Sequence, residues 1–474
     1  MAKQKIMLGE WLPDQPGVVG SVTEATNCYP VTNGYAPFKG ESDLSDNAGA
    51  ELLITFAGKF ANSISLFAGS TSNLYKFSPA DLDLDALTTT GYSNIEFWDV
   101  AQYGQTMIAA NGADKLQSYD LIAGTSFANL AAAAPAAKFV TVIKDFVVAG
   151  NVSGEENKVY WSDINDETDW TPGAASQSDS QVLPDGGNIT GLAGGEFGLI
   201  FMERAIYRMT YSGSPFFFQF DAISRSLGCI SYGSVCQYGG LTYFLADDGF
   251  YVCDGQSLKN IGEEKVNRYF FDISSKVDLK LKMSSGVDPI RKLVIWCTPL
   301  QSGGYGLFVY SIPLNRWSYI ETTATSVASV LTATTTLENL DNYSASIDAL
   351  DVSLDDPQWA GGNLIIAGTK GQKIITFGNS FKSAHISTGD IDIGRSTVML
   401  ARPIVDGGSG SIAVASRDNL GEHVLFGDSV AADAENRVSL RSNGDFHRLK
   451  LIPTGTNWKT AVGMEVELFP QGSR

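Results

Sequence analysis

The sequence predicts an all-β protein made of a β-propeller with six or seven blades, a C-terminal β-sandwich and an extended N-terminal arm. Two observations lead to this fold class. Short runs of Val, Ile, Thr, Tyr and Phe alternate with clusters of Gly, Asn, Asp and Ser, and glycine occurs 49 times in 474 residues. Such a texture is typical of short strands joined by tight turns. In addition, one hairpin-like pattern recurs along most of the chain.

The recurring pattern is a short apolar strand, a polar or glycine-rich turn, and a second strand with aromatic character. Its second strands begin near Leu74, Leu116, Val159, Ile206, Phe250, Leu307 and Ile374. The first five starts lie about 42–47 residues apart, close to the ~40–50 residues of a four-stranded propeller blade. Blades in a ring bury one another, which a lone hairpin cannot do. Hairpins in stacked sandwiches remain the alternative.

Changes in composition and in the periodicity of apolar residues divide the chain into three predicted regions. Residues 1–50 carry turn signals with little periodicity, and we expect an extended arm there. The propeller is expected over residues 51–380, with an insertion near 321–360 that is rich in Thr, Ser and Ala and forms either a loop excursion or an irregular blade. Residues 381–474 alternate apolar and polar positions, which predicts strands with one buried face and a separate small sandwich.

The overall charge limits the choice of partners. The chain has 52 acidic and 33 basic residues, a formal charge of −19, and a negative surface repels phosphate, so tight DNA binding is disfavoured. The acidic charge either keeps a large protein in solution or provides a wall that does not grip passing DNA. Five cysteines without a CxxC pair predict buried free thiols. We expect neither a secretion signal nor a membrane span.

Candidates for chemistry are few. The chain has only three histidines, none in a metal-ligand spacing, and it lacks the motifs of serine hydrolases, P-loop proteins and zinc proteases. One segment, VYWSDINDETDWTPG, alternates oxygen-bearing side chains as a calcium loop does, at Asp163, Asn165, Glu167 and Asp169. Thr168 and Ala174 stand where an EF-hand needs Gly and Glu. We therefore expect a polar hairpin turn, with calcium as the alternative, and otherwise no metal, cofactor or catalytic residue.

Six segments in a fixed order cover nearly the whole chain: EWLPDQPG, ATNCYPVTNGYAPFKG, LPDGGNITGLAGGEFGLIFMERAIYRMTYSG, LTYFLADDGFYVCDGQSLKNIGEEKVNRYF, LFVYSIPLNRWSYI and FHRLKLIPTGTNWKTAVGMEVEL. In this order they resemble the packaged-DNA stabilisation, or tail nozzle, proteins of short-tailed, podovirus-type bacteriophages. The resemblance implies a hexameric ring in the virion tail, assembled in the host cytoplasm. The ring would bind the adaptor below the portal and a distal needle or plug. It would retain packaged DNA, conduct it without sequence-specific binding, and have no enzymatic activity.

A ring subunit buries some of its surface only on assembly, and aromatic residues in turns are candidates for that surface. Two groups stand out, Trp11, Tyr29, Tyr35 and Phe38 in the arm, and Phe216, Phe217 and Phe218 in SGSPFFFQF. The second group belongs either to an interface or to a blade core, and the arm either docks on a neighbour or closes the propeller. The rival functions are a glycan-binding or glycan-cleaving propeller and a bacterial scaffold unrelated to virions. A funnel pocket with paired carboxylates or arginines would favour the glycan function.

Overall fold

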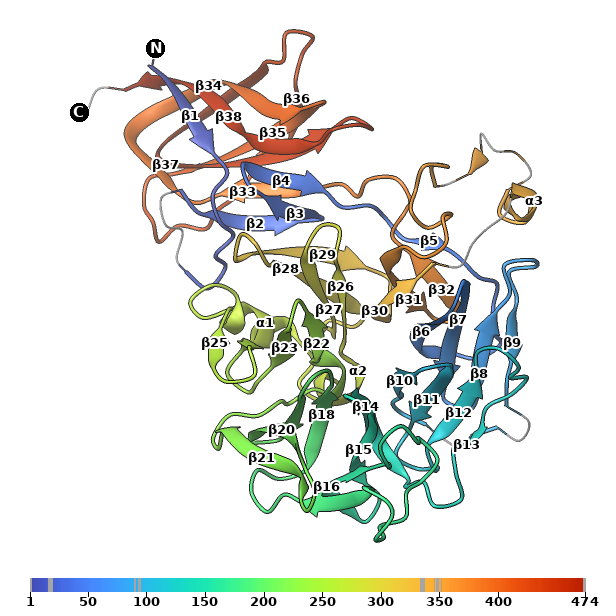
Figure 1. Cartoon of the computed structure of the whole chain (residues 1–474). Coiled ribbons are helices and arrows are strands. Elements are labelled where there is room, and N and C mark those ends of the chain that lie inside the picture. The colour runs from blue at the N-terminus through green and yellow to red at the C-terminus, as the bar shows by residue number, and fades with distance from the viewer. Residues whose placement is uncertain are drawn as a thin grey trace.

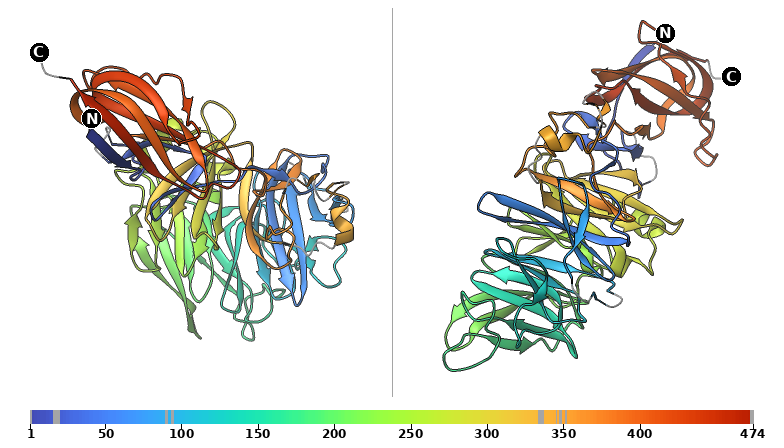
Figure 2. Two further views of the ribbon diagram at one scale, coloured as in Figure 1. Left: turned by 90° about the horizontal axis from the view of Figure 1, so that it is seen from above. Right: turned by 90° about the vertical axis from the view of Figure 1, so that its right-hand side faces the viewer.

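The structure is a computed structural model of the chain, and it describes residues 2–15, 20–88, 91–92, 95–332, 337–344, 346, 349–350 and 352–471. Strands dominate throughout, and they form two bodies, a propeller and a C-terminal sheet (Figure 1). The two further views in Figure 2 show the C-terminal sheet standing at one edge of the propeller. The prediction of an all-β propeller is confirmed.

Six blades are separate four-stranded antiparallel sheets. The first three are β6 (Leu52–Phe60), β7 (Ser63–Ser70), β8 (Leu74–Phe77) and β9 (Leu84–Ala86); β10 (Asp99–Tyr103), β11 (Thr106–Ala110), β12 (Gln117–Asp120) and β13 (Ala128–Asn129); and β14 (Ala137–Ile143), β15 (Phe146–Val152), β16 (Glu155–Trp161) and β17 (Asp179–Val182). The next two are β18 (Ile189–Ala193), β19 (Gly198–Met202), β20 (Ile206–Gly213) and β21 (Phe217–Ser224); and β22 (Cys236–Tyr238), β23 (Leu241–Leu245), β24 (Phe250–Cys253) and β25 (Leu258–Asn260).

The sixth separate blade closes the ring with strands from distant parts of the sequence. It consists of β30 (Ser326–Leu331), β31 (Leu364–Lys370), β32 (Lys373–Thr376) and β5 (Ser42–Asp43). β5 comes from the N-terminal segment and pairs antiparallel with β32 through Ile375 and Thr376. Because a strand from the start of the chain completes the last blade, the propeller cannot open at this blade without breaking that pairing.

A seventh four-stranded unit lies between the fifth blade and the closing blade. It is formed by β26 (Ser284–Asp288), β27 (Leu293–Pro299), β28 (Tyr305–Ser311) and β29 (Arg316–Thr322), and its β29 continues into the C-terminal sheet. The seven hairpins read from the sequence correspond to the second and third strands of these seven units. For example, β8, β20 and β24 begin at the expected residues Leu74, Ile206 and Phe250.

The expected C-terminal sandwich is not confirmed. The main strands of the C-terminal body are β33 (His385–Thr388), β34 (Ile391–Asp406), β35 (Ser409–Arg417), β36 (Val430–Ala431), β37 (Val438–Thr454) and β38 (Thr460–Pro470). They belong to one continuous sheet, because the long strands β34 and β37 bend and change partners along their length.

The expectation of an extended arm over residues 1–50 is also corrected, since this segment supplies strands. They are β1 (Ala2–Met7), β2 (Val22–Thr26), β3 (Cys28–Val31) and β4 (Gly34–Pro37) in the C-terminal sheet, and β5 in the propeller. β1 pairs with β38, and β2 lies between β33 and β29. Strands of the C-terminal sheet supply hydrogen-bond partners for the backbone of the N-terminal segment. The sequence of the segment does not reveal these partners, because they lie far away in the chain.

The expected insertion near residues 321–360 begins later than proposed. β29 extends to Thr322 and the inner strand β30 already occupies Ser326–Leu331, so the excursion lies between β30 and β31. It contains the short helix α3 (Leu337–Leu340), and part of it lies outside the described residues. The excursion is therefore a loop within the closing blade. Elsewhere in the described part of the chain, no helix is long and apolar enough to cross a membrane.

We predict that ring closure depends measurably on Ser45, which is buried beside β5. Its hydroxyl accepts a hydrogen bond from the Ile374 amide at 2.9 Å and donates one to the Asp46 carbonyl at 3.0 Å. Ser45→Ala leaves a buried amide without a partner, which costs about 1–3 kcal/mol. The urea midpoint of unfolding should fall accordingly. Ser63→Ala, at an exposed serine outside the closure, is the control; equal midpoints for the two variants would contradict the prediction.

Candidate functional site

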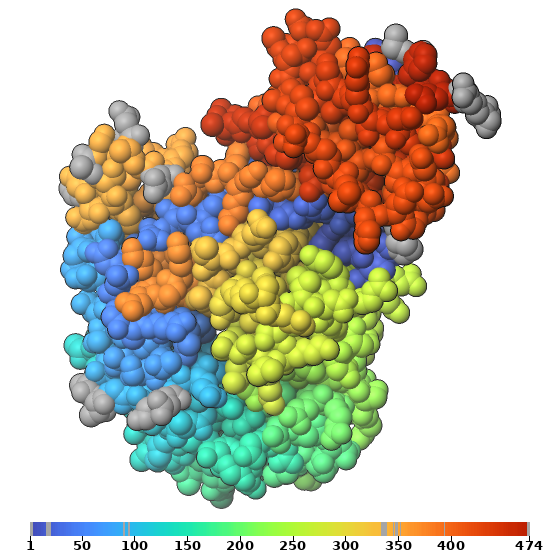
Figure 3. All heavy atoms as spheres, turned by 180° about the vertical axis from the view of Figure 1, so that it is seen from behind, coloured from blue at the N-terminus to red at the C-terminus, as the bar shows by residue number. Residues whose placement is uncertain are grey.

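The N-terminal segment runs between the propeller and the C-terminal sheet, and polar and aromatic contacts hold it at this junction. Seen from behind in Figure 3, the blue N-terminal segment separates the orange-red C-terminal body from the yellow and green blades. Its contacts fall into three groups, around Trp11, around Arg316 and around Glu41. Contacts of this kind help the two bodies to keep one orientation.

Trp11 is the apolar anchor of the segment. Its side chain is buried, its ring meets Tyr269 edge-on at 5.5 Å, and it lies 6.5 Å from the ring of Phe308. The indole Nε1 donates to the Thr23 carbonyl at 3.2 Å. A buried tryptophan whose N–H is paired contributes large apolar area without a desolvation penalty, so Trp11 holds residues 8–15 on the propeller.

Asp14, from a distant part of the sequence, accepts hydrogen bonds from backbone N–H groups in the first turn of helix α1 (Asn267–Ile273). Its carboxylate accepts the backbone N–H groups of Arg268 at 2.9 Å and Tyr269 at 2.7 Å. Amides in the first turn of a helix have no partner within the helix, and a carboxylate there is also favoured by the helix dipole. Close by, Lys265 pairs with Glu10 at 2.7 Å.

Arg316, at the start of β29, binds the backbone of the N-terminal segment. Its guanidinium donates to the carbonyls of Gly9 and Val31 and lies 5.2 Å from the ring centre of Tyr35. The Tyr35 hydroxyl donates to the same Gly9 carbonyl at 2.9 Å, and burial raises the pKa of this tyrosine well above its usual value. A planar guanidinium suits this role because it can bond two carbonyls and cover a ring at once.

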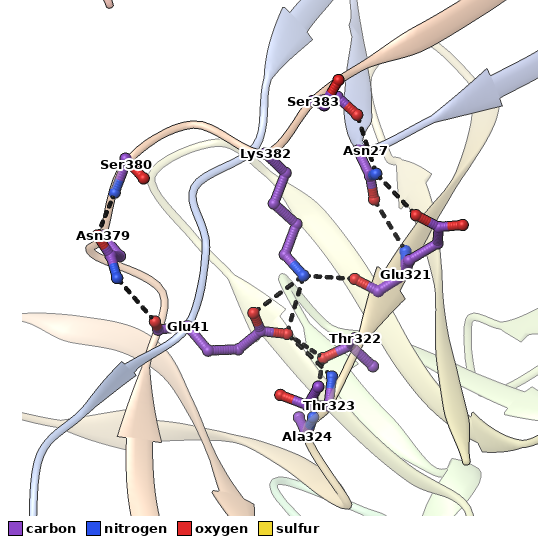
Figure 4. Close-up of polar contacts among 10 residues, drawn as sticks. All are labelled: Asn27, Glu41, Glu321, Thr322, Thr323, Ala324, Asn379, Ser380, Lys382 and Ser383. Atoms are coloured by element: carbon purple, nitrogen blue, oxygen red, sulfur yellow. Dashed lines mark hydrogen bonds and ion pairs between the residues drawn. The ribbon is translucent and has the colours of Figure 1, made fainter.

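Glu41 and Lys382 form the ionic centre of the junction (Figure 4). The Lys382 ammonium lies 2.9 Å from the Glu41 carboxylate and donates to the Glu321 carbonyl at 2.5 Å. Thr322 donates its hydroxyl to Glu41 at 2.6 Å. Burial raises the pKa of Glu41, but the hydrogen bonds from Thr322 and Lys382 outweigh it and leave this pKa below its usual value. Three segments therefore meet at one carboxylate.

Asn27 completes the same cluster (Figure 4). Its backbone has a φ of 60°, its amide nitrogen donates to the Glu321 carboxylate at 3.1 Å and to the Ser383 carbonyl at 3.0 Å, and its amide oxygen accepts the Glu321 N–H at 3.0 Å. Asparagine tolerates a positive φ better than most residues. Both ends of one amide are thus used to hold β29 against the segment that leads into β33.

The structure places the seven proposed interface aromatics in different surroundings. Trp11, Tyr35, Phe38 and Phe218 are buried in the chain's own core, so the proposal that they form a subunit interface is corrected. Phe218 of β21 packs on Phe146 and Trp161 of the preceding blade, so it lies in the core between two blades. Tyr29 and Phe217 are half-buried. Phe216 is 81% exposed and remains available to another subunit.

The calcium candidate segment forms a turn between β16 and β17, and each of its three candidate carboxylates accepts a hydrogen bond from the protein. Asp163 accepts the Gln177 amide at 2.6 Å, Glu167 accepts the Thr106 hydroxyl at 3.1 Å, and Asp169 accepts the Thr171 amide at 2.9 Å. Asn165 has a φ of 57°, as a turn residue does. No group of three or more His, Cys, Asp or Glu side chains within the described ranges could hold a metal ion.

A cavity of about 460 Å³ lies where the inner strands β6, β10, β26 and β30 begin. Its lining residues include the acidic Glu51, Glu96 and Asp99, the basic Lys282, and several aromatic and aliphatic residues. Cavities of this size are common for small ligands. Sequence reasoning missed this site because its residues come from seven separate segments that no local motif connects.

Comparisons with known proteins add little about function. No model of a known protein family and no curated protein matches the sequence. Among solved structures, the chain is similar to a putative 6-phosphogluconolactonase from Bacteroides uniformis ATCC 8492, with 13% sequence identity and a TM-score of 0.37. The match covers 57% of this chain and 82% of that protein. At this TM-score it supports no argument about activity.

The Glu41–Lys382 pair should be strongly coupled, because the exposed fractions of its side chains are only 11% and 17%. Removing one partner leaves a buried charge, so Glu41→Gln and Lys382→Met should each lower the free energy of unfolding by about 3–5 kcal/mol, and the double variant by less than their sum. A double-mutant cycle measures the coupling. The control is the more exposed pair Asp43–Lys373, where we expect about 0.2–1 kcal/mol; similar coupling in both pairs would contradict this assignment.

The same pair should give a defined pH dependence. Because the pKa of Glu41 is lower in the folded protein, its stabilising effect is present above the usual carboxyl range and is lost as pH falls through the folded pKa. The difference in melting temperature between the natural protein and Glu41→Gln should therefore shrink from pH 6 to pH 3. Thermal unfolding followed by circular dichroism measures it, and a difference that stays constant would exclude this role for Glu41.

Proposed function

We propose that the protein is a structural subunit of the tail of a short-tailed bacteriophage, forming a nozzle or hub ring below the portal and adaptor. In this role six copies surround a channel, retain the packaged DNA and conduct it during ejection. A needle, plug or other distal tail protein closes the ring. The chain performs no catalysis in this assembly.

The observation that carries the proposal is the interlaced junction. At the two ends of the sequence, the described parts of the segments that resemble tail nozzle proteins, residues 10–15, 25–40 and 446–468, lie in the C-terminal sheet or the junction. The internal segments form β18–β20, β23–α1 and β28–β29. The resemblance therefore covers two blades as well as the junction and the C-terminal sheet, so it spans both bodies of the subunit.

The distribution of charge also supports a conduit for DNA. Residues 51–380 contain 35 acidic and 20 basic residues, a formal charge of −15, whereas the remaining 144 residues contribute −4. A propeller with this charge repels phosphate at short range and gives DNA few sites at which to bind. DNA could then slide past the subunit without being held.

A second candidate function, a glycan-binding or glycan-cleaving propeller, is favoured by one observation. Three carboxylates line the cavity at the start of the inner strands, and paired carboxylates are the groups that glycosidases use. A screen of bacterial polysaccharides for binding and hydrolysis tests this function. Hydrolysis that is lost in Glu51→Gln or Glu96→Gln would favour it over the structural role.

The direct test of the structural role is cryo electron microscopy of virions that carry an affinity tag on this chain. Density for the tag in a sixfold ring below the portal is the expected result. Virions that lack the chain, or a tag elsewhere on the particle, would overturn the proposal. Deletion of the gene should yield particles that lose DNA after packaging.

Ring assembly should depend on Phe216, the one strongly exposed residue of the proposed aromatic interface. Phe216→Ser should leave the melting temperature of the monomer nearly unchanged, because the side chain makes little contact within the chain, and should reduce the hexamer fraction at least tenfold. Analytical ultracentrifugation measures both species. Ile122→Ser, at another exposed apolar side chain, is the control, and equal hexamer fractions for the two variants would remove Phe216 from the interface.

A further inference from the structure

The cavity at the start of the inner strands plays no part in the proposed ring. It is bounded by β6, β10, β26 and β30 and by the helices η1 (Tyr232–Ser234) and α2 (Leu279–Lys282). Its wall is mostly apolar, with Ile54, Phe97, Val235, Met283 and Val327 among the lining residues. A volume of about 460 Å³ is enough for a molecule of roughly ten to fifteen non-hydrogen atoms.

Asp99 is the polar group that distinguishes this cavity. Its two carboxylate oxygens accept the backbone N–H groups of Val100 at 3.1 Å and Val140 at 2.9 Å, and these bonds fix the direction of the side chain. Burial raises the pKa of Asp99 to about 7, although the two amides act against that rise. Within the described ranges, Asp99 takes part in none of the ion pairs. A carboxylate in such a setting is stabilised by a cation that enters the cavity.

The other charged groups of the cavity lie near its exposed rim. Glu51 and Glu96 are exposed and add negative charge. Lys282 is exposed and pairs with Asp278 at 2.8 Å, so its charge is already partly balanced. Among the residues that line the cavity three are acidic and one is basic, so the lining itself favours positive over negative charge.

The aromatic rings favour the same kind of ligand. Phe97 and Tyr232 lie edge to face at 5.6 Å. The ring of Tyr232 already has two cations near it, Lys138 at 5.0 Å and Lys280 at 5.3 Å. No lysine or arginine of the described residues lies over the ring of Phe97. A ligand ammonium near Phe97 would gain about 0.5–2 kcal/mol from the ring.

We propose that this cavity binds a small organic amine, with its ammonium group at Asp99 and its apolar stem against Phe97 and the aliphatic wall. A neutral sugar would not neutralise the carboxylate, and an acid would meet three like charges. A free amine and the lysine side chain of a partner protein share this chemistry. The inference does not depend on the proposed tail function, because it concerns a single chain.

The test is isothermal titration calorimetry at pH 8 with three molecules of similar shape and different charge. Tyramine is a cation, p-cresol is neutral, and 3-(4-hydroxyphenyl)propionate is an anion. Tyramine should bind at least tenfold more tightly than p-cresol, and the anion should not bind. Nα-acetyl-lysinamide as a fourth probe distinguishes the sources, since tighter binding of this molecule than of tyramine would indicate a protein side chain.

Asp99→Asn should weaken tyramine binding at least tenfold and leave p-cresol unchanged, because it removes the charge and keeps the shape. Asp85→Asn, which removes one exposed charge from the outer strand β9, is the matched control and should change neither. If Asp99→Asn fails to fold, Phe97→Leu answers the question by lowering the ratio of tyramine to p-cresol affinity. Equal affinities of tyramine and p-cresol, or tyramine binding that is unaffected by the loss of Asp99, would overturn the proposal.

Discussion

The pairing of β5 with β32 is the constraint on which the rest of the structure depends. It brings residues more than 300 positions apart in the sequence into one blade, and it fixes the end of the N-terminal segment on the propeller. The part of that segment before β5 must then cross the gap to the C-terminal sheet. Trp11, Arg316 and the Glu41–Lys382 pair lie along this crossing, so the junction is a consequence of how the ring is closed.

Closure by distant strands makes both bodies depend on each other. β2 lies between β29 of the propeller and β33 of the C-terminal sheet, and one hydrophobic core runs through this contact, from Phe250 and Trp317 to Trp458 and Val466. A core that is shared by two bodies resists their relative rotation, because rotation would expose apolar surface on both. The shared core therefore favours one fixed orientation of the two bodies.

The local signals in the sequence were sufficient for the propeller. Hairpins such as LTYFLADDGFYV carry their own turn and their own alternation of buried and exposed positions, and those properties are set by neighbours in the sequence. The junction could not be predicted from the sequence in the same way. Arg316 and Lys382 look like ordinary surface residues in the sequence, because their partners are backbone carbonyls and a carboxylate from segments about 60 to 340 positions away.

The sequence by itself determined the all-β class, the repeated hairpins and the acidic charge, since composition and short-range periodicity fix these properties. Only the tertiary structure decided that the N-terminal segment forms strands, that Trp11 and Tyr35 are core residues, and that Asp99 faces a cavity. The physical reason is the same in each case. Burial and strand pairing depend on which distant segments come together. The residues of a strand do not by themselves indicate which distant strand will pair with it.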